Sequence, residues 1–152
     1  SICGQFLMKF PHVDISDIIT RADLKPSRTK SDYNNNIKYD SGRIVPFDNE
    51  YLLLSFAKLD KEGLGKMSRE QYLSCLSTMW REISKYYNYE DIAIPIIGDG
   101  ITRFGDESLT KQELVNIIIR SYQLSPYKIP NTLHIVCLKS KNFTIDKVEE
   151  SL

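Results

Sequence analysis

An apolar run that ends in two glycines constrains this chain more than any other feature. The run extends from Ile92 to Ile97, and Gly98, Asp99 and Gly100 follow it directly. Such a run predicts a buried strand of an α/β sheet, and the glycines predict a loop in which backbone approaches a ligand closely. Ligands of open α/β sheets lie beyond the carboxyl ends of the strands. We therefore expect the binding site at this loop, with an anionic nucleotide as its ligand.

Helical and strand-like segments alternate along most of the chain. Two capping boxes, Ser68 to Gln71 and Thr110 to Glu113, each open an amphipathic helix. From residue 43 onward the order is β-β-α-β-α-β-α, which predicts one α/β layered domain with parallel inner strands and helices on both faces. The predicted strands cover residues 43–47, 51–57, 92–97 and 132–138, and further helices cover 2–10, 14–20 and 144–152.

Two of the predicted strands contain a proline, and a glycine-containing segment follows a third. Pro46 marks the first strand as an edge strand, since proline cannot donate a hydrogen bond to the sheet. Pro95 conflicts with an interior strand for the same reason, and we expect a bulge or an unpaired position there. The strand at 132–138 is apolar and is predicted to be buried. Residues 58–67 are predicted to be a loop.

Composition excludes several classes of function. The 152 residues contain 20 basic and 20 acidic side chains, whereas nucleic-acid binding proteins usually carry a basic excess. No apolar run approaches the roughly 20 residues of a membrane-spanning helix, and no signal peptide is visible. Cys3, Cys75 and Cys137 lack metal or redox spacing, so we expect no metal site or cofactor. Cys75 and Cys137 are predicted to be buried apolar residues, in a cytoplasmic protein.

The glycine pair and the residues after it can form an anion site. Glycines allow backbone N–H groups to converge on a phosphate, and Arg103 can bind the same phosphate with two hydrogen bonds. Phe104 is expected to stack on a ribose or base. The spacing matches neither the phosphate loop of nucleoside triphosphatases nor the dinucleotide-binding fingerprint. The alternative interpretation of Gly98 and Gly100 is a tight turn that binds no ligand.

Other polar residues give little sign of catalysis. Asp99 would repel a diphosphate, so it either points away to a ribose hydroxyl or an amine, or it caps the loop locally. His12 and His134 are interpreted as structural histidines. The sequence contains no recognisable nucleophile motif, metal set or acid–base pair, and we assign no catalytic residue.

The segment from Ile92 to Phe104 resembles the strand-loop signature of macro domains, which bind ADP-ribose. The version in this sequence is similar to the macro domain of the Thoeris antiphage-defence effectors, whose partners are TIR-domain enzymes. The resemblance also covers Ser1–Phe6, Leu52–Asp60, Tyr72–Leu76 with Trp80, and Leu109–Leu114.

This resemblance implies a fold and a domain organisation. The fold would be a three-layer α/β/α sandwich with a mixed, largely parallel sheet, whose N-terminal strands are absent from this chain. Residues 1–152 would form a single macro-like ligand-binding domain in the C-terminal part of a longer effector. The chain begins at Ser1 without a methionine, which agrees with that expectation.

The resemblance also implies a binding site. Gly98 to Phe104, including Ile101 and Thr102, would be one of two phosphate loops. The other would end in Ser1, Ile2, Cys3 and Gly4. The ligand would be an ADP-ribose derivative, either cyclic or conjugated to an amino acid, that a TIR enzyme makes from NAD.

The implied function is that of a sensor in bacterial antiphage defence. Ligand binding would activate an attached effector, either an NAD-consuming domain or a pair of upstream transmembrane helices, with homo-oligomerisation as one route. The resemblance implies no contact of this segment with nucleic acid or membrane. Two alternatives remain, namely a hydrolase of ADP-ribose esters or conjugates, and a protein-interaction module without nucleotide binding.

Overall fold

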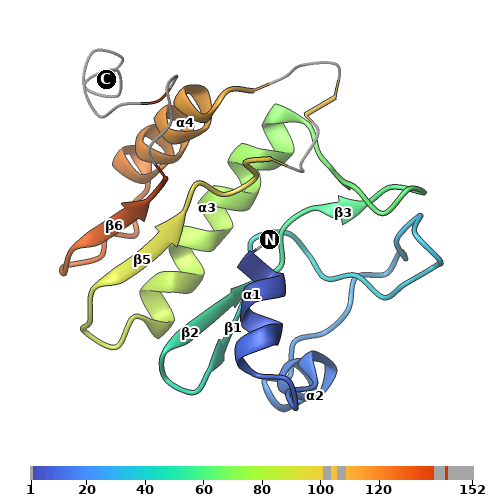
Figure 1. Ribbon diagram of the computed structural model, residues 1–152. Helices are drawn as coiled ribbons and strands as arrows, with labels where there is room; N and C mark the ends of the chain where they lie inside the picture. The colour runs from blue at the N-terminus through green and yellow to red at the C-terminus, as the bar shows by residue number, and fades with distance from the viewer. Residues whose placement is uncertain (1, 101–103, 106–108, 139–142, 144–152) are drawn as a thin grey trace.

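The computed structural model describes residues 2–100, 104–105, 109–138 and 143, and Figure 1 shows how they are arranged. The helix predicted at 144–152 lies outside these residues. The helices are α1 (Ile2–Lys9), α2 (Ile15–Arg21), α3 (Arg69–Tyr86) and α4 (Lys111–Leu124). The strands are β1 (Ile44–Phe47), β2 (Tyr51–Leu54), β3 (Lys58–Leu59), β4 (Gly65–Lys66), β5 (Ile92–Pro95) and β6 (Leu133–Val136).

Strands β1 and β2 form the predicted antiparallel hairpin. Its turn contains Asp48 and Asn49 with φ angles of 53° and 55°, as a type I′ turn requires at both central positions. Ile44 and Val45 are both buried although successive side chains of a strand point to opposite faces. Both faces of the hairpin are therefore covered.

Helices α1 and α3 contribute to covering this hairpin. Ile44 belongs to the main core, which also contains the buried side of α3. The rings of Phe6, in α1, and of Phe10, directly after it, pack edge-on against Phe47, with centroids 5.5 and 5.3 Å away, and against Tyr51. An aromatic cluster thus attaches α1 to the end of the hairpin beside its turn.

Helix α3 is the central element of the core, and Figure 1 shows it running behind the strands. Ser68 and Gln71 form both hydrogen bonds of the predicted capping box. Glu82 is buried on this helix, where it binds Arg43 and Lys85. Burial raises its pKa, but these two hydrogen-bonded cations reverse the effect and lower the pKa overall. The predicted apolar stripe is fully buried and comprises Tyr72, Leu76, Met79, Trp80 and Ile83.

Helix α4 packs beside α3. Its capping box at Thr110 and Glu113 is formed as predicted. The indole Nε1 of Trp80 donates a hydrogen bond of 2.9 Å to the hydroxyl of Ser121, and the Trp80 ring lies 4.9 Å from that of Tyr122. The two helices are therefore joined by a polar contact as well as by apolar packing.

Strands β5 and β6 form a parallel pair in which Ile92 is opposite Leu133 and Pro95 is opposite Val136. The side chains of Ile94, Leu133 and Ile135 face the core. Ala93 and His134 are exposed, so the described residues leave the other face of this pair open. The helix predicted at 144–152 lies outside the described residues, so a helix on this second face stays a prediction.

Four predictions require correction. The strand at 132–138 is shorter than predicted and alternates between half-buried and exposed residues, rather than being buried throughout. Cys137, just beyond it, is exposed, whereas Cys75 is buried as predicted. Pro95 causes no bulge because β5 ends there, after a regular register. The segment 58–67 is a short hairpin, β3–β4, rather than a loop.

The α/β class is confirmed, with one parallel strand pair and two antiparallel pairs among the described residues. Helices and strands are mixed along the chain, and a parallel pair is joined through α4. In the part of the chain that the structure describes, no helix is both long enough and apolar enough to cross a membrane.

Candidate functional site

The predicted ligand loop begins with a tight turn at the carboxyl end of β5. The amide of Asp99 donates a 3.2 Å hydrogen bond to the carbonyl of Ile96, which closes a four-residue turn. Gly98 occupies its third position with a φ of 88°, the geometry for which a type II turn needs glycine. Gly100 follows with a φ of 96°. The sequence therefore contains glycine where the backbone requires it.

Two backbone donors of this turn are unused. Neither the N–H of Gly98 nor that of Gly100 has a hydrogen-bond partner among the residues that the structure describes. Gly98 is half-buried and Gly100 is exposed. The N–H of Asp99, which lies between them, is used within the turn, so the two glycine N–H groups are separate donors that an anion could bind rather than a nest of successive N–H groups. The turn can thus accept a negatively charged group without rearranging existing hydrogen bonds.

The two glycines differ in their surroundings. A Cβ atom added to Gly98 would lie 3.1 Å from Cζ of Phe104 and 3.2 Å from Cζ of Phe56. A Cβ atom added to Gly100 would meet nothing within 4 Å. Gly98 is therefore packed against two aromatic rings, whereas the space beside Gly100 is open to a ligand.

The packing beneath the turn comes from α3 and from the loop itself. The hydroxyl of Tyr72 donates a 2.6 Å hydrogen bond to the carbonyl of Ile97. Burial raises the pKa of this hydroxyl, which keeps it protonated and able to donate. The ring of Phe104 lies 5.2 Å from that of Tyr72 in an edge-on arrangement. The turn is therefore fixed to the core through two kinds of contact.

Phe104 does not have the predicted stacking role in this structure. Only 5% of the residue is exposed, and its ring packs against Tyr72 and beneath Gly98. An aromatic ring that stacks on a base needs a free face. Phe104 instead attaches the loop to the core, because its buried ring packs against Tyr72.

Asp99 has a local partner. Its carboxylate lies 3.5 Å from the ammonium group of Lys111, at the first position of α4, and both side chains are about one third exposed. This ion pair connects the turn to the helix that follows it and reduces the charge that a phosphate would meet. Direct contact between Asp99 and a ligand remains a prediction.

The other predicted site residues are less completely defined. Ser1, Ile101, Thr102 and Arg103 lie outside the described residues. Ile2, Cys3 and Gly4 form the first turn of α1, with Gly4 half-buried. In Figure 1 the amino end of α1 and the carboxyl end of β5 are directed to the same side of the molecule. That arrangement is compatible with the two predicted phosphate segments serving one ligand.

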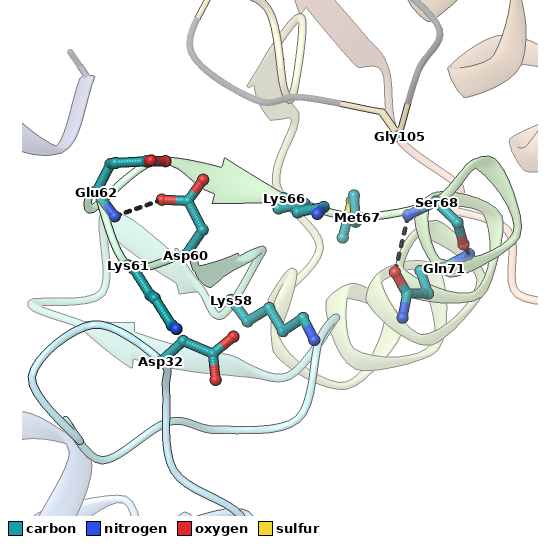
Figure 2. Close-up of a pocket in the computed structure, with 10 residues that line it drawn as sticks. All are labelled: Asp32, Lys58, Asp60, Lys61, Glu62, Lys66, Met67, Ser68, Gln71 and Gly105. Carbon is teal, nitrogen blue, oxygen red and sulfur yellow. Dashed lines mark hydrogen bonds between the residues drawn. The ribbon is translucent and has the colours of Figure 1, made fainter.

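A cavity of about 480 Å³ lies beside the loop, between the β3–β4 hairpin and the amino end of α3 (Figure 2). Gly105 belongs to its wall and is part of the same loop as Gly98 and Gly100. Among the described residues of the loop, Gly105 is the one that lines the cavity. The remaining lining residues are Asp32, Lys58, Asp60, Lys61, Glu62, Lys66, Met67, Ser68 and Gln71.

The hairpin wall of this cavity carries opposed positive charges. Lys58 and Lys66 are direct partners in the β3–β4 register, and like charges in such positions destabilise a pair of strands. Among the described residues neither ammonium group has an ion-pair partner. Asp60 accepts hydrogen bonds of 3.0 Å from the amides of Glu62 and Leu64 and so organises the turn.

The β3–β4 hairpin was not predicted from the sequence. A signal was present, because Asp60 precedes Gly63 in a short polar segment, as in many hairpin turns. The strands have only two residues each, too few for an alternating pattern to be recognised.

Among the described residues, no group of three or more histidine, cysteine or acidic side chains is placed to hold a metal ion.

Comparisons with known proteins agree with the sequence resemblance. The family model described as the macro domain of the Thoeris protein ThsA matches residues 1–138. The Thoeris protein ThsA of Bacillus amyloliquefaciens (strain Y2) is 26% identical over 147 residues, which cover 91% of this chain. The chain spans about half the length of that relative, 49%. Since the family match includes the turn, α3, α4 and both strands of the parallel pair, this chain belongs to the ThsA macro-domain family.

Proposed function

We propose that this domain is the sensor of a Thoeris-type antiphage-defence protein, and that it binds an ADP-ribose-derived nucleotide at the Gly98–Gly100 turn. The ligand is a cyclic or amino-acid-conjugated ADP-ribose produced by a TIR enzyme. Binding activates an effector module elsewhere in the same polypeptide. The domain acts in the bacterial cytoplasm, by binding rather than by turnover.

One observation supports this proposal above all. The backbone N–H groups of Gly98 and Gly100, which have no hydrogen-bond partner among the described residues, follow a strand of a parallel pair, and the space beside Gly100 is open. A diphosphate needs donors rather than a large apolar pocket, and backbone donors at strand ends commonly provide them. Family membership adds the expectation that the diphosphate belongs to ADP-ribose.

The adjacent cavity supports a ligand larger than the diphosphate alone. Its volume of about 480 Å³ lies within the usual range for small-molecule sites, roughly 300–1,000 Å³. Its wall carries both lysines and acidic side chains around the hairpin, together with polar groups from the amino end of α3 (Figure 2). A polar group attached to the diphosphate would therefore be accommodated there.

Calorimetric titration of the full-length protein tests the proposal. The panel contains ADP-ribose, NAD, cyclic ADP-ribose isomers and amino-acid conjugates of ADP-ribose. We expect tight binding of one modified ADP-ribose and weak binding of ADP-ribose and NAD. Binding of none of these ligands would contradict the proposal and favour a protein-interaction module.

The hydrolase alternative has a direct test of its own. Enzymes that cleave ADP-ribose esters can position water with the substrate phosphate and a few polar groups, so the lack of a recognised catalytic set excludes them only weakly. Each ligand that binds is therefore incubated with the protein and analysed by chromatography. Intact ligand after many binding lifetimes supports the sensor, whereas steady product release supports the hydrolase.

A further inference from the structure

We propose that Tyr72 is a positioning residue of the ligand site, because its hydroxyl sets the orientation of the Ile97–Gly98 peptide and so directs the Gly98 N–H toward the bound anion. This inference rests on the proposed function, since it concerns the same turn. It assigns a ligand-related role to a side chain that itself touches no ligand.

The orientation of the peptide between Ile97 and Gly98 supports this proposal. In a trans peptide the C=O and the N–H point in opposite directions. The C=O of Ile97 points into the core, where it accepts the 2.6 Å hydrogen bond from Tyr72. The N–H of Gly98 belongs to the same peptide and must point away from Tyr72. Within the part of the chain that the structure describes, this N–H has no hydrogen-bond partner.

The peptide between Ile97 and Gly98 is the central peptide of the four-residue turn, and it is the part of the turn that can rotate. Type I and type II turns share their end points and differ mainly by rotation of the central peptide. Glycine permits both orientations, so Gly98 alone does not select one. The hydrogen bond from Tyr72 to Ile97 selects the orientation in which Gly98 has a φ of 88°. With that bond removed, the donor would be free to turn away from the ligand.

The donor side chain is itself rigidly held. Tyr72 has 0% exposure and its ring lies between Phe56 and Phe104, with centroids 6.0 and 5.2 Å away. Its backbone N–H binds the carbonyl of Ser68 within the capped first turn of α3. The hydroxyl therefore has little freedom to follow the turn if the peptide rotates.

A role confined to fold stability would give a different result from a positioning role. Tyr122 provides the matched control, because its half-buried hydroxyl also binds a backbone carbonyl and an amide, both of Ile129. Tyr122 lies on α4 and does not line the cavity beside the β3–β4 hairpin, and its side chain contacts Trp80, Lys128 and Ile129. Tyr72→Phe and Tyr122→Phe each remove one hydroxyl and keep the ring.

The experiment measures the melting temperature of the parent and both variants, and the dissociation constant for the tightest nucleotide of the panel. We expect both variants to remain folded with lowered melting temperatures. Tyr72→Phe should weaken binding roughly tenfold or more, the effect of losing one hydrogen bond to a charged group. Tyr122→Phe should bind as the parent does.

The amide resonance of Gly98 adds a readout at the donor itself. In the parent, adding the nucleotide or inorganic pyrophosphate should shift the Gly98 amide proton, and in Tyr72→Phe this shift should be much smaller. Equal affinity of Tyr72→Phe and parent would overturn the positioning role and leave the proposed function standing. An unmoved Gly98 amide in a saturated parent would overturn both the positioning role and the placement of the ligand at this turn, and leave only the sensor function standing. A parent that binds no ligand of the panel would overturn the positioning role and the proposed function together.

Discussion

The glycine turn and the β3–β4 hairpin are built in opposite ways. The glycine turn is fixed to the core by Tyr72, Phe104 and Phe56, all of which belong to the core or pack against it. The β3–β4 hairpin, which lines the cavity, has only two residues in each strand and places Lys58 opposite Lys66. The turn is held by apolar packing and a buried hydrogen bond, whereas the hairpin includes an unfavourable charge pair.

This difference indicates how the turn and the hairpin contribute to binding. A preorganised set of donors loses little conformational entropy when a ligand arrives, so the turn should provide much of the affinity. Side chains such as lysine lose more on being ordered, but an anion between them would relieve their repulsion. The side chains of the β3–β4 hairpin should therefore change conformation when the ligand binds, while the conformation of the glycine turn should not change.

The largest expected effect follows from Gly98→Ala. The positive φ strains an L-residue by about 1–2 kcal/mol, and the new methyl group would press on Phe104 and Phe56, which adds roughly 1–3 kcal/mol. We expect the free energy of unfolding to fall by about 2–5 kcal/mol and nucleotide binding to be lost. Chemical denaturation and calorimetry measure the two effects. A variant as stable as the parent would contradict the described packing.

Gly100→Ala is the matched second change. The same residue is introduced at a similar φ, but nothing lies within 4 Å of the new Cβ. We expect only the strain of about 1–2 kcal/mol on the free energy of unfolding. Gly100→Val at the same position should fill the space beside the turn and weaken nucleotide binding further. If Gly100→Val binds as tightly as the parent, the ligand does not approach this glycine.

The ion pair between the turn and α4 should have a smaller effect. Lys111→Met removes the cation beside Asp99 while keeping an unbranched side chain. Because the pair is partly exposed, its loss should lower the free energy of unfolding by at most about 1 kcal/mol. Nucleotide affinity should fall as well, since the carboxylate of Asp99 would repel a phosphate without its partner. Unchanged affinity would show that Asp99 lies away from the ligand.

The smallest expected effect is a gain in stability from Lys66→Glu. Opposite charges would then face each other across the hairpin, which should raise the free energy of unfolding by about 0.2–1 kcal/mol. Nucleotide affinity should fall if the lysine wall meets an anionic group. Lys25→Glu, at an exposed lysine that pairs with Asp23, is the control for overall charge. Equal affinities for the two variants would exclude the hairpin wall from binding.

The sequence predicted elements whose signals are local. Both capping boxes and the stripe around Trp80 were correct, because helix ends and apolar periodicity are encoded within a few residues. The β1–β2 hairpin was also predicted, although its turn conformation at Asp48 and Asn49 required the structure. The position of the glycine turn after β5 belongs to the same category.

Errors arose where burial depends on distant parts of the chain. The apolar residues at 132–138 suggested a buried strand, but Val136 and Leu138 are 60% and 83% exposed because no described element covers that face. Phe104 was assigned to the ligand because it follows Gly98 and Gly100 in sequence. Whether its ring faces the ligand or Tyr72 depends on how α3 packs, which sequence spacing does not encode.

The parallel pairing of β5 with β6 has a consequence for the order in which the protein becomes functional during synthesis. Ile92 is paired with Leu133, so the turn at Gly98 gains its supporting strand only after α4 and β6 have been made. At about 5–20 residues per second, this delay is roughly 2–8 seconds. The β1–β2 hairpin and α3 can form earlier from local contacts. On the proposed function, a nascent chain would thus be unable to bind its nucleotide until β6 has left the ribosome.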